Sequence, residues 1–420
     1  MDLDICILSD RFPPHGRGGA AVIAKQLAEA YRDRGHNVSV ITTVRERADD
    51  SFERRNGIAV RKVYTQFDSR YRAYYSIYNP QTVSQVGSSL ERFDPDVVHA
   101  HNVHEFLSYY TLRVASNRSL PVVLTYHDAM SVAYGKVTDV PEGITPSEAL
   151  SEGVSYEVSA LEQFRKHQFR YFPLRNHLNR YYLSTYVDEG IAVSHELGGF
   201  LSEQGVNCRR VIHNGVSTAA SENADGASFR EEFELEDAKI VLFGGRVSRL
   251  KGSHQLAQAI RSLAAGSTDA TLVVTGETNR TTKQIATLLD GYDEQLVTTG
   301  WISTTKMAAA FDAADIVASP SLYLDPFPTV NLEAMAAGTP VVTTCFGGAK
   351  ELVEEGHSGI IVNPFDTGAL ANAIQTLLED EELRAQYGSN AKRRVDKDFD
   401  LASAADAYLS VMRDLVDRSA

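Results

Sequence analysis

Short hydrophobic runs alternate along this 420-residue chain with longer stretches in which apolar residues recur at helical spacing. Runs of this kind, bounded by polar or glycine-containing turns, are typical of strands buried in a parallel sheet. The first half contains such runs at residues 5–8, 38–42, 58–64, 96–101, 122–126, 190–194 and 210–215. The second half contains them at residues 239–243, 271–276, 296–300, 315–319, 340–344 and 359–363. The alternation predicts an α/β protein with parallel sheets and crossover helices.

Two such sheets follow one another in the sequence, and the polar stretch 217–228 interrupts the alternation between them. A chain of 420 residues exceeds the usual size of a single core. We therefore expect two Rossmann-like domains, at 1–216 and 239–398, joined by a linker at 217–238. Residues 401–416 have apolar positions at helical spacing, and we treat 399–420 as a separate C-terminal helix.

Composition and charge narrow the class of protein. A hydrophobic fraction of 43% and a charged fraction of 23% are typical of a soluble globular protein. The acidic, strand-like first residues do not resemble a secretory signal, and Cys6, Cys208 and Cys345 lack metal-ligand spacing, so we expect a cytoplasmic protein. The formal net charge of −14 lies mostly in the second half, and neither half is basic, which disfavours nucleic acid binding.

Residues 325–342, DPFPTVNLEAMAAGTPVV, combine two carboxylates with the expected start of a helix. Seven residues separate Asp325 from Glu333, and a helix beginning just after Pro328 would present free backbone N–H groups near both. Such N–H groups suit a phosphate, while carboxylates accept hydrogen bonds from ribose and sugar hydroxyls. The stretch resembles the signature of the retaining glycosyltransferases of family 4, in which two acidic residues are separated by seven others.

A second stretch, residues 244–252 (GGRVSRLKG), strengthens this resemblance. It follows a predicted strand and holds Arg246 and Lys251 five positions apart, as a diphosphate with about two negative charges requires. In family 4 these two cations neutralise the diphosphate leaving group of a nucleotide-sugar. The resemblance covers nearly the whole chain and implies the GT-B fold. In that fold two Rossmann-like domains face a central cleft, and the C-terminal helix crosses back to the first domain.

The first domain opens with a strand, a glycine-rich loop and a helix. Gly18 and Gly19 permit a tight turn where the helix begins. A dinucleotide site is the alternative, but the G-x-G-G spacing differs from G-x-G-x-x-G and no acidic residue ends the second strand. The resemblance implies that Gly18 and Gly19 approach the donor diphosphate from the acceptor-binding domain.

Histidines follow the predicted strands of the first half. His127 ends one strand directly, at the sheet edge where ligands bind in open α/β folds, and family 4 has a histidine here that contacts the transferred sugar. Asp128 either orients that ring or caps the next segment. His99, His101 and His104 could be zinc ligands by spacing, but we favour His101 and Asn102, together with Asp128, as acceptor-side residues. Asp94 and Asp96 precede their strand, so the D-x-D metal motif is rejected.

Residues 164–183 interleave arginine and lysine with phenylalanine and tyrosine. One interpretation is a half-buried helix with a solvated basic face. The other is a peripheral contact with the inner face of a membrane, or with a lipid-linked or anionic acceptor. Residues 64–78, with five tyrosines, extend the same surface or stack on sugar rings.

The resemblance implies a metal-independent, retaining hexosyltransferase of carbohydrate biosynthesis, without a cofactor, that moves a hexose from a nucleoside diphosphate sugar to a hydroxyl. The acceptor is a carbohydrate, a lipid-linked molecule or a small molecule. The expected catalytic residues are His127, Arg246, Lys251 and Asp325. The expected donor contacts are Gly18, Gly19, Arg246, Lys251, Asp325, Phe327, Thr329, Val330 and Glu333.

Two departures from the family pattern leave the donor sugar open: Asp325 stands where the family usually has glutamate, and Pro328 where it usually has glycine. Two alternatives remain beside a transferase: a nucleotide-sugar epimerase of the same fold, and a non-catalytic nucleotide-sugar-binding homologue.

Overall fold

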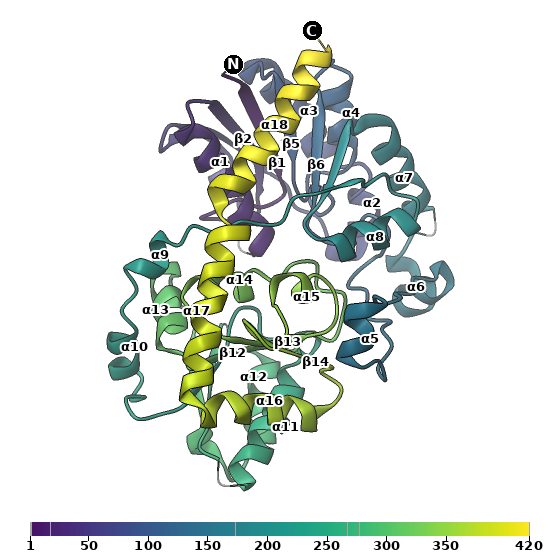
Figure 1. Ribbon diagram of the computed structural model, residues 1–420. Coiled ribbons are helices and arrows are strands. Elements are labelled where there is room, and N and C mark those ends of the chain that lie inside the picture. Colours follow the sequence, from purple (N-terminus) through teal and green to yellow (C-terminus); the bar gives the residue numbers. More distant parts are fainter. Residues whose placement is uncertain (1, 17, 173, 267, 277, 420) are drawn as a thin grey trace. The chain divides into compact units, whose positions relative to one another are not determined.

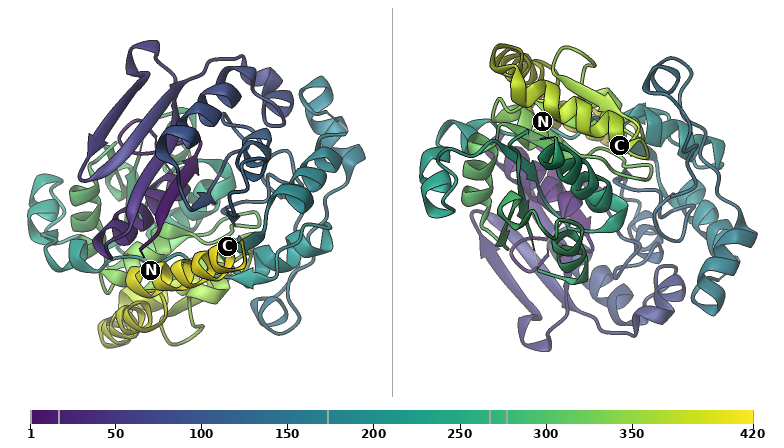
Figure 2. Two further views of the ribbon diagram at one scale, coloured as in Figure 1. Left: turned by 90° about the horizontal axis from the view of Figure 1, so that it is seen from above. Right: turned by 90° about the horizontal axis from the view of Figure 1, so that it is seen from below.

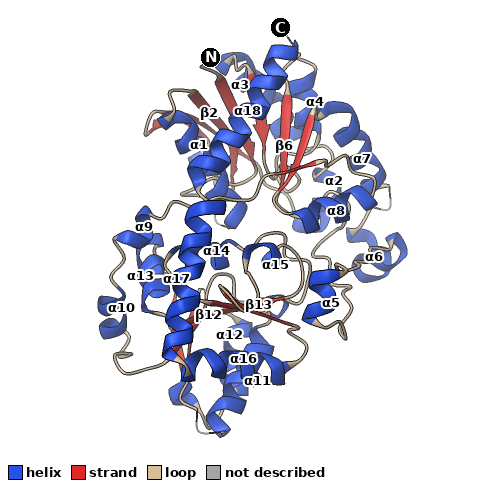
Figure 3. Ribbon diagram, in the orientation of Figure 1, coloured by secondary structure: helices blue, strands red, loops and turns tan. Residues whose placement is uncertain are grey.

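The computed structural model describes residues 2–16, 18–172, 174–266, 268–276 and 278–419. The chain divides into two compact units. Unit 1 consists of residues 1–137, 157–215 and 401–420, and unit 2 of residues 138–156 and 216–400. Each unit is a mainly parallel sheet with helices packed against it (Figures 1 and 3).

Unit 1 contains an eight-stranded sheet in the order β3-β4-β2-β1-β5-β6-β7-β8. Its strands are β1 (Asp4–Ser9), β2 (Asn37–Val44), β3 (Ser51–Arg55), β4 (Ile58–Tyr64), β5 (Val97–Ala100), β6 (Val122–Tyr126), β7 (Glu189–Ala192) and β8 (Arg210–Val211). Its helices are α1 (Gly19–Asp33), α2 (Arg72–Tyr75), α3 (Pro80–Phe93), α4 (Tyr110–Ser116), α6 (Ala160–His167), α7 (Arg175–Tyr186), α8 (His195–Glu203) and α18 (Leu401–Ser419). Short 3-10 turns span Arg47–Asp49, Ser69–Tyr71 and Gln168–Arg170.

Unit 2 contains a six-stranded parallel sheet in the order β11-β10-β9-β12-β13-β14. Its strands are β9 (Ile240–Phe243), β10 (Thr271–Thr275), β11 (Leu296–Gly300), β12 (Ile316–Ser319), β13 (Val341–Thr344) and β14 (Gly359–Val362). Its longer helices are α11 (Ser253–Ala265), α12 (Arg280–Leu288), α13 (Thr304–Ala313), α14 (Thr329–Ala336), α16 (Thr367–Glu379) and α17 (Glu381–Asp398). Its short helices are α5 (Pro146–Ser151), α9 (Ala219–Glu222), α10 (Gly226–Glu232), α15 (Ala349–Leu352) and the 3-10 turns Arg249–Lys251 and Asp293–Gln295.

Every strand predicted from the hydrophobic runs is present, and the predicted α/β fold with two parallel sheets is confirmed. The sequence analysis missed β3, which pairs antiparallel with β4 at one edge of the unit 1 sheet (Figure 2). The sequence of β3 is SFERR, and its residues are half-buried or exposed. A polar edge strand carries no hydrophobic run, which explains why the pattern does not reveal it.

The C-terminal helix α18 packs on unit 1, as expected. Ala405, Tyr408, Leu409 and Met412 lie in one hydrophobic core with side chains of α1 and β1. Arg34, just after α1, fixes the start of α18, because its Nε donates to Asp406 Oδ1 (2.5 Å) and its Nη2 to the Ala402 carbonyl (2.8 Å).

Residues 138–156 belong to unit 2, although the sequence analysis placed them in the first domain. Asn363 Nδ2 donates to the carbonyls of Glu142 (2.6 Å) and Ile144 (2.8 Å), and Lys350 Nζ donates to that of Ala149 (2.7 Å). This segment, which we call the strap, has little periodicity of its own. Its backbone carbonyls are instead satisfied by side chains of unit 2.

The predicted linker 217–238 is not an open tether. It forms α9 and α10, which pack on α13. The backbone N–H of Gly226 donates to Asp312 Oδ2 (2.9 Å), and Arg230 Nη2 donates to the Ala313 carbonyl (2.7 Å). These partly buried hydrogen bonds fix the segment to unit 2.

The basic-aromatic segment 164–183 is not one helix with a solvated basic face. It is divided among α6, the turn Gln168–Arg170 and α7. Arg175, expected on the exposed face, is fully buried and donates to the Met130 carbonyl (2.6 Å) and Ser76 Oγ (3.2 Å). None of the helices in the described ranges is long and apolar enough to span a membrane.

Candidate active-site residues

The predicted donor residues of unit 2 gather at the carboxyl ends of two neighbouring strands. Arg246 and Lys251 follow β9, and Asp325 follows β12, which pairs directly with β9. The chain leaves β9 for β10 on one side and returns through β12 on the other, so this point is the switch in strand order. Ligands of open α/β sheets bind at such a switch point.

Lys251 and Asp325 are in direct contact at this edge. Lys251 Nζ donates to Asp325 Oδ2 at 2.5 Å, and Ser321 Oγ donates to the same oxygen at 2.8 Å. Asp325 is 4% exposed. Burial alone would lower the pKa of Lys251, but the Asp325 carboxylate raises it above its ordinary value. Lys251 is therefore positively charged and Asp325 negatively charged. A site that binds an anion with the first group and sugar hydroxyls with the second requires these charges.

The backbone of Asp325 is enclosed by a glycine turn. Gly348 N–H donates to the Asp325 carbonyl at 2.8 Å. Gly347 has a φ of +71°, and a Cβ there would lie 2.1 Å from the Asp325 carbonyl oxygen. Only glycine fits this position, because both the positive φ and the contact exclude a side chain. Tyr156, at the end of the strap, accepts a 2.7 Å hydrogen bond from Gly347 N–H.

Helix α14 begins after Pro328 and is anchored by Asn331. The Asn331 Oδ1 accepts a hydrogen bond from Ser319 Oγ at 2.5 Å, and its Nδ2 donates to Thr343 Oγ1 at 2.9 Å. These bonds connect the first turn of α14 to β12 and β13. Asn331, which the sequence analysis did not assign a role, is thus a buried support for the predicted site.

Glu333 lies on α14 and is half-buried. Burial raises its pKa from 4.5 to about 7. Within the described ranges it forms no hydrogen bond or ion pair. A half-buried carboxylate without a partner is costly to a fold, which makes it a candidate for binding a ligand.

The other predicted donor residues differ in exposure. Arg246 is exposed and forms no ion pair with any residue that the structure describes. Thr329 and Val330 are half-buried on the first turn of α14. Phe327 is buried, and its ring packs on Phe399 with 5.6 Å between ring centroids. A donor contact from Phe327 would therefore come from its backbone.

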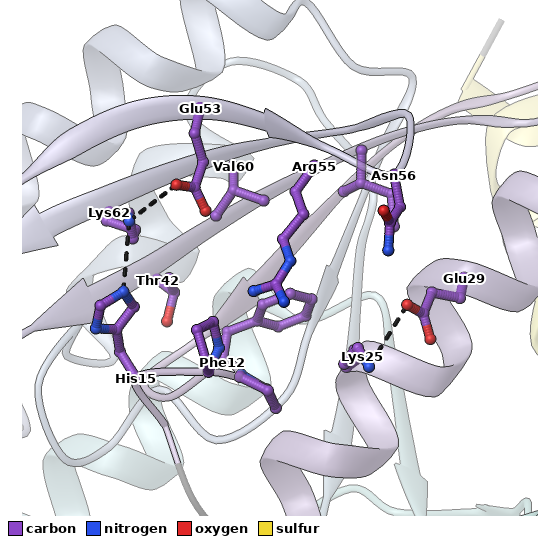
Figure 4. Close-up of a pocket in the computed structure, with 13 residues that line it drawn as sticks. Phe12, His15, Lys25, Glu29, Thr42, Glu53, Arg55, Asn56, Val60 and Lys62 are labelled. Atoms are coloured by element: carbon purple, nitrogen blue, oxygen red, sulfur yellow. Dashed lines mark hydrogen bonds and ion pairs between the residues drawn. The ribbon is translucent and has the colours of Figure 1, made fainter. Parts of the chain in front are cut away.

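In unit 1 the glycine loop follows β1 and ends at α1. Gly18 is the N-cap of α1 with a φ of +121°, and Gly19 is the first residue of the helix. Figure 4 shows how the loop is fixed to β4: His15 Nε2 lies 3.5 Å from Lys62 Nζ, which also donates to Glu53 Oε2 at 3.0 Å. In this small pocket Lys25 also pairs with Glu29 at 3.6 Å, and no predicted site residue is among its described lining residues.

His127 is paired with His101. Their rings are joined at 2.8 Å between His127 Nε2 and His101 Nδ1. Burial lowers the pKa of His127 to about 4 and that of His101 well below its ordinary value, so both rings are neutral at pH 7. The Nε2 of His101 is buried and has no partner among the described residues. His101 thus orients His127, a role that the sequence analysis had offered to Asp128.

Asp128 is bonded to other groups. It accepts hydrogen bonds from Met130 N–H (2.9 Å) and Asn102 Nδ2 (3.2 Å), and it lies 3.4 Å from His104 Nε2. Burial alone would lower the pKa of His104, but Asp128 raises it. His99 uses both ring nitrogens, against Tyr31 OH (3.2 Å) and Thr125 Oγ1 (2.9 Å). Because His99 uses both ring nitrogens, these pairings disfavour a zinc site shared by His99, His101 and His104.

Asp10 is a buried carboxylate at the same sheet edge that the sequence analysis missed. It directly follows β1 and accepts hydrogen bonds from the backbone N–H groups of Glu105 (2.6 Å), Phe106 (2.8 Å) and Leu107 (2.6 Å). Burial raises its pKa to about 6. The position of Asp10 directly after the first strand could have identified it from the sequence. An acidic residue at that position faces the loop that follows the neighbouring strand.

The models of two glycosyltransferase families match consecutive parts of this chain. The family described as Glycosyltransferase Family 4 matches residues 17–220, and the family described as Glycosyl transferases group 1 matches residues 226–394. The putative glycosyltransferase YtcC of Bacillus subtilis is 32% identical over 186 residues, which are 42% of this chain and 46% of that protein. The matched region thus spans about half the length of this relative.

Solved structures share the fold over the whole chain. Sucrose-phosphate synthase from Thermosynechococcus elongatus has 22% identity and a TM-score of 0.77, and the match covers 99% of each chain. HepE from Anabaena, in complex with UDP-glucose, has 21% identity and a TM-score of 0.71, covering 98% of this chain and 100% of that one. At these identities the likeness shows the GT-B fold. The two family models, matched in order along most of the sequence, show that this chain belongs to the glycosyltransferases of family 4.

Proposed function

We propose that this protein is a retaining hexosyltransferase that uses a nucleoside diphosphate sugar as donor and a hydroxyl as acceptor. The observation that carries the proposal is the Lys251–Asp325 pair at the switch point of the unit 2 sheet, with the unpaired carboxylate of Glu333 on the adjoining helix. Cation, sugar-binding carboxylate and ribose-binding carboxylate are the three groups that such a donor needs.

Each group has a proposed task. Lys251 and the exposed Arg246 offset the charge that grows on the departing diphosphate, which is the largest expected electrostatic contribution. Asp325 accepts hydrogen bonds from sugar hydroxyls, and Glu333 accepts them from the ribose. The bond between the anomeric carbon and the diphosphate oxygen breaks, and a bond to the acceptor oxygen forms on the same face. The acceptor proton passes to the leaving phosphate, so configuration is retained without a protein nucleophile.

Two cations at the diphosphate make a divalent metal unnecessary in this proposal. A metal-dependent transferase would place carboxylates where Arg246 and Lys251 stand. HepE was solved with UDP-glucose, which makes UDP-glucose the first donor to test.

A panel of UDP-, GDP- and ADP-sugars, each incubated with the protein with and without sugar acceptors, tests the proposal. Release of the nucleoside diphosphate that depends on an acceptor supports a transferase, and an anomeric NMR signal of the product with the donor's configuration supports retention. Conversion of the donor sugar without an acceptor would instead indicate an epimerase. Nucleotide binding without any turnover would indicate a non-catalytic homologue.

Contact with a membrane is a further part of the proposal. Leu161, Phe164, Leu174 and Tyr181 are exposed large hydrophobic side chains of α6, α7 and the residues between them. Arg165 and Lys166 are exposed beside them. Co-flotation with vesicles of anionic lipid, but not with phosphatidylcholine vesicles, would support it. Absence of flotation with both would refute it.

A further inference from the structure

Unit 1 contains a cavity of about 690 Å³ at the carboxyl edge of its sheet. Its lining includes Asp10 after β1, Arg45 after β2, Phe67 after β4, Phe106 after β5 and Tyr134 after β6. The switch in strand order of this sheet lies between β1 and β5, inside the same arc. The volume falls within the roughly 300–1,000 Å³ of small-molecule sites. All of its described lining residues belong to unit 1.

Several charged groups of this cavity are already paired. Arg11 donates to both oxygens of Glu105, at 3.0 and 2.7 Å. Arg70 donates to Asp68 at 2.8 and 2.6 Å. Asp10 is occupied by three backbone N–H groups, and Asp49 lies 3.5 Å from His15. Glu46 is exposed at the rim.

Two arginines of the lining stack on aromatic rings, and Glu105 is near enough to Arg45 to interact with it electrostatically. The guanidinium carbon of Arg45 lies 4.6 Å from the centroid of Phe106 and 5.5 Å from that of Phe67. The guanidinium carbon of Arg72 lies 4.9 Å from the centroid of Tyr134. Neither arginine forms an ion pair with a residue in the described ranges. A guanidinium stacked on a ring keeps its N–H edge free, and that edge fits the oxygens of a phosphate.

One more arginine and a histidine that is neutral at pH 7 lie at the same cavity. Arg170 and His167 also line the cavity. Burial lowers the pKa of His167, and Lys166, Arg72 and Arg170 lower it further. Arg45 and Arg72 therefore remain without an ion pair in the described ranges, while Asp10, Asp49 and Glu105 have partners and Glu46 is exposed at the rim.

We propose that this cavity binds the phosphate group of a phosphorylated acceptor, with Arg45 and Arg72 as its principal ligands and the rings of Phe67, Phe106 and Tyr134 as the walls. The proposal rests on the proposed transferase function, since it names the acceptor class of that reaction. The donor diphosphate is assigned to Arg246 and Lys251 in unit 2, so the cations of unit 1 are available to a second anion. The phosphate belongs either to a soluble sugar phosphate or to a lipid headgroup.

Calorimetry with glucose 6-phosphate, inorganic phosphate and unphosphorylated glucose tests the site. The titrations are made in saturating UDP, so that the donor residues are occupied. We expect both phosphates to bind, glucose not to bind, and Arg45→Gln or Arg72→Gln to weaken binding by roughly 10- to 100-fold, as expected for losing a hydrogen bond to a charged group. Arg92→Gln is the matched control, because Arg92 also stacks on a ring, Phe52 at 4.0 Å, but lies outside the cavity.

Flotation with phosphatidylcholine vesicles that contain phosphatidic acid separates the two sources of phosphate. Loss of vesicle binding in Arg45→Gln would indicate that the cavity binds the phosphate of a lipid headgroup. Vesicle binding that this substitution does not change would indicate that the cavity binds a soluble sugar phosphate. Equal affinity of wild type and both arginine variants for phosphate would overturn the proposal, as would displacement of phosphate by UDP. Phosphate binding in a protein that turns over no nucleotide-sugar would refute the transferase function but not this site.

Discussion

Glu333→Gln tests whether the carboxylate on α14 serves a ligand at a cost to the fold. Burial raises the pKa of Glu333 from 4.5 to about 7, so the folded chain holds this proton more tightly than the unfolded chain does. Between these two values the unfolded state binds fewer protons, and the free energy of unfolding therefore falls as pH rises through this window. Glutamine cannot ionise, so the variant avoids that loss.

The magnitude follows from the two pKa values. We compare each pH with a low pH at which Glu333 is protonated in both the folded and the unfolded state. Ionisation lowers the free energy of unfolding by about 1.4 kcal/mol at pH 5.5 and by about 3.4 kcal/mol at pH 8.5, because each pKa unit of difference is about 1.4 kcal/mol. These are upper limits, since the side chain is half-buried and water reaches part of it. We expect Glu333→Gln to be more stable than the wild type, and its advantage to grow by at most about 2 kcal/mol between pH 5.5 and pH 8.5.

Urea denaturation at the two pH values, followed by circular dichroism, measures this difference. Glu231→Gln on the exposed face of α10 is the control and should show no pH-dependent gain. The same Glu333→Gln protein should lose affinity for the nucleotide-sugar, since the ribose hydroxyls lose a carboxylate acceptor. An advantage that is equal at both pH values would refute the burial argument. Unchanged donor affinity would refute the ribose assignment.

Three further predictions concern the charged groups of both units. Lys251→Met and Arg246→Met should each slow the chemical step, measured by single-turnover kinetics, by roughly 100-fold or more, because a positive charge at the diphosphate is lost. Arg249→Met, at an exposed position of the same turn, is the control and should not slow it. Transfer should continue in EDTA, and a loss that magnesium or manganese restores would contradict metal independence. Asp10→Ala should destabilise the protein by roughly 2–5 kcal/mol, because three backbone N–H groups, buried or partly buried, lose their acceptor. An unchanged urea midpoint would contradict this.

The strands could be predicted because their runs are apolar on both faces, as a sheet covered by helices requires. The sequence pattern predicts that Lys251 and Asp325 each follow a strand. It does not predict that these strands, β9 and β12, are neighbours in the sheet. The resemblance to the GT-B fold predicts this strand order. The structure has β9 and β12 paired, and Lys251 and Asp325 form an ion pair of 2.5 Å.

Other features depend on tertiary contacts that no local pattern records. Arg175 lies in a segment whose composition indicates an exposed basic face, yet it is buried because the Met130 carbonyl and Ser76 need a donor. Asp128 adjoins His127 in sequence, but its partners are His104 and Asn102. The strap has no periodic pattern, and its place in unit 2 is decided by Asn363 and Lys350, which lie some two hundred residues later in the chain.

The division of the chain into interleaved segments has a consequence for its synthesis. The polypeptide passes from one unit to the other at 137/138, 156/157, 215/216 and 400/401. The ribosome therefore completes every strand of the unit 1 sheet long before it makes α18, whose Ala405, Tyr408, Leu409 and Met412 complete that unit's core. Until then an apolar face of the nascent sheet lacks its cover, and unit 2 must emerge in the meantime. We therefore expect the first unit to be translated to be the last to finish folding, and its exposed apolar surface to need shielding by chaperones until then.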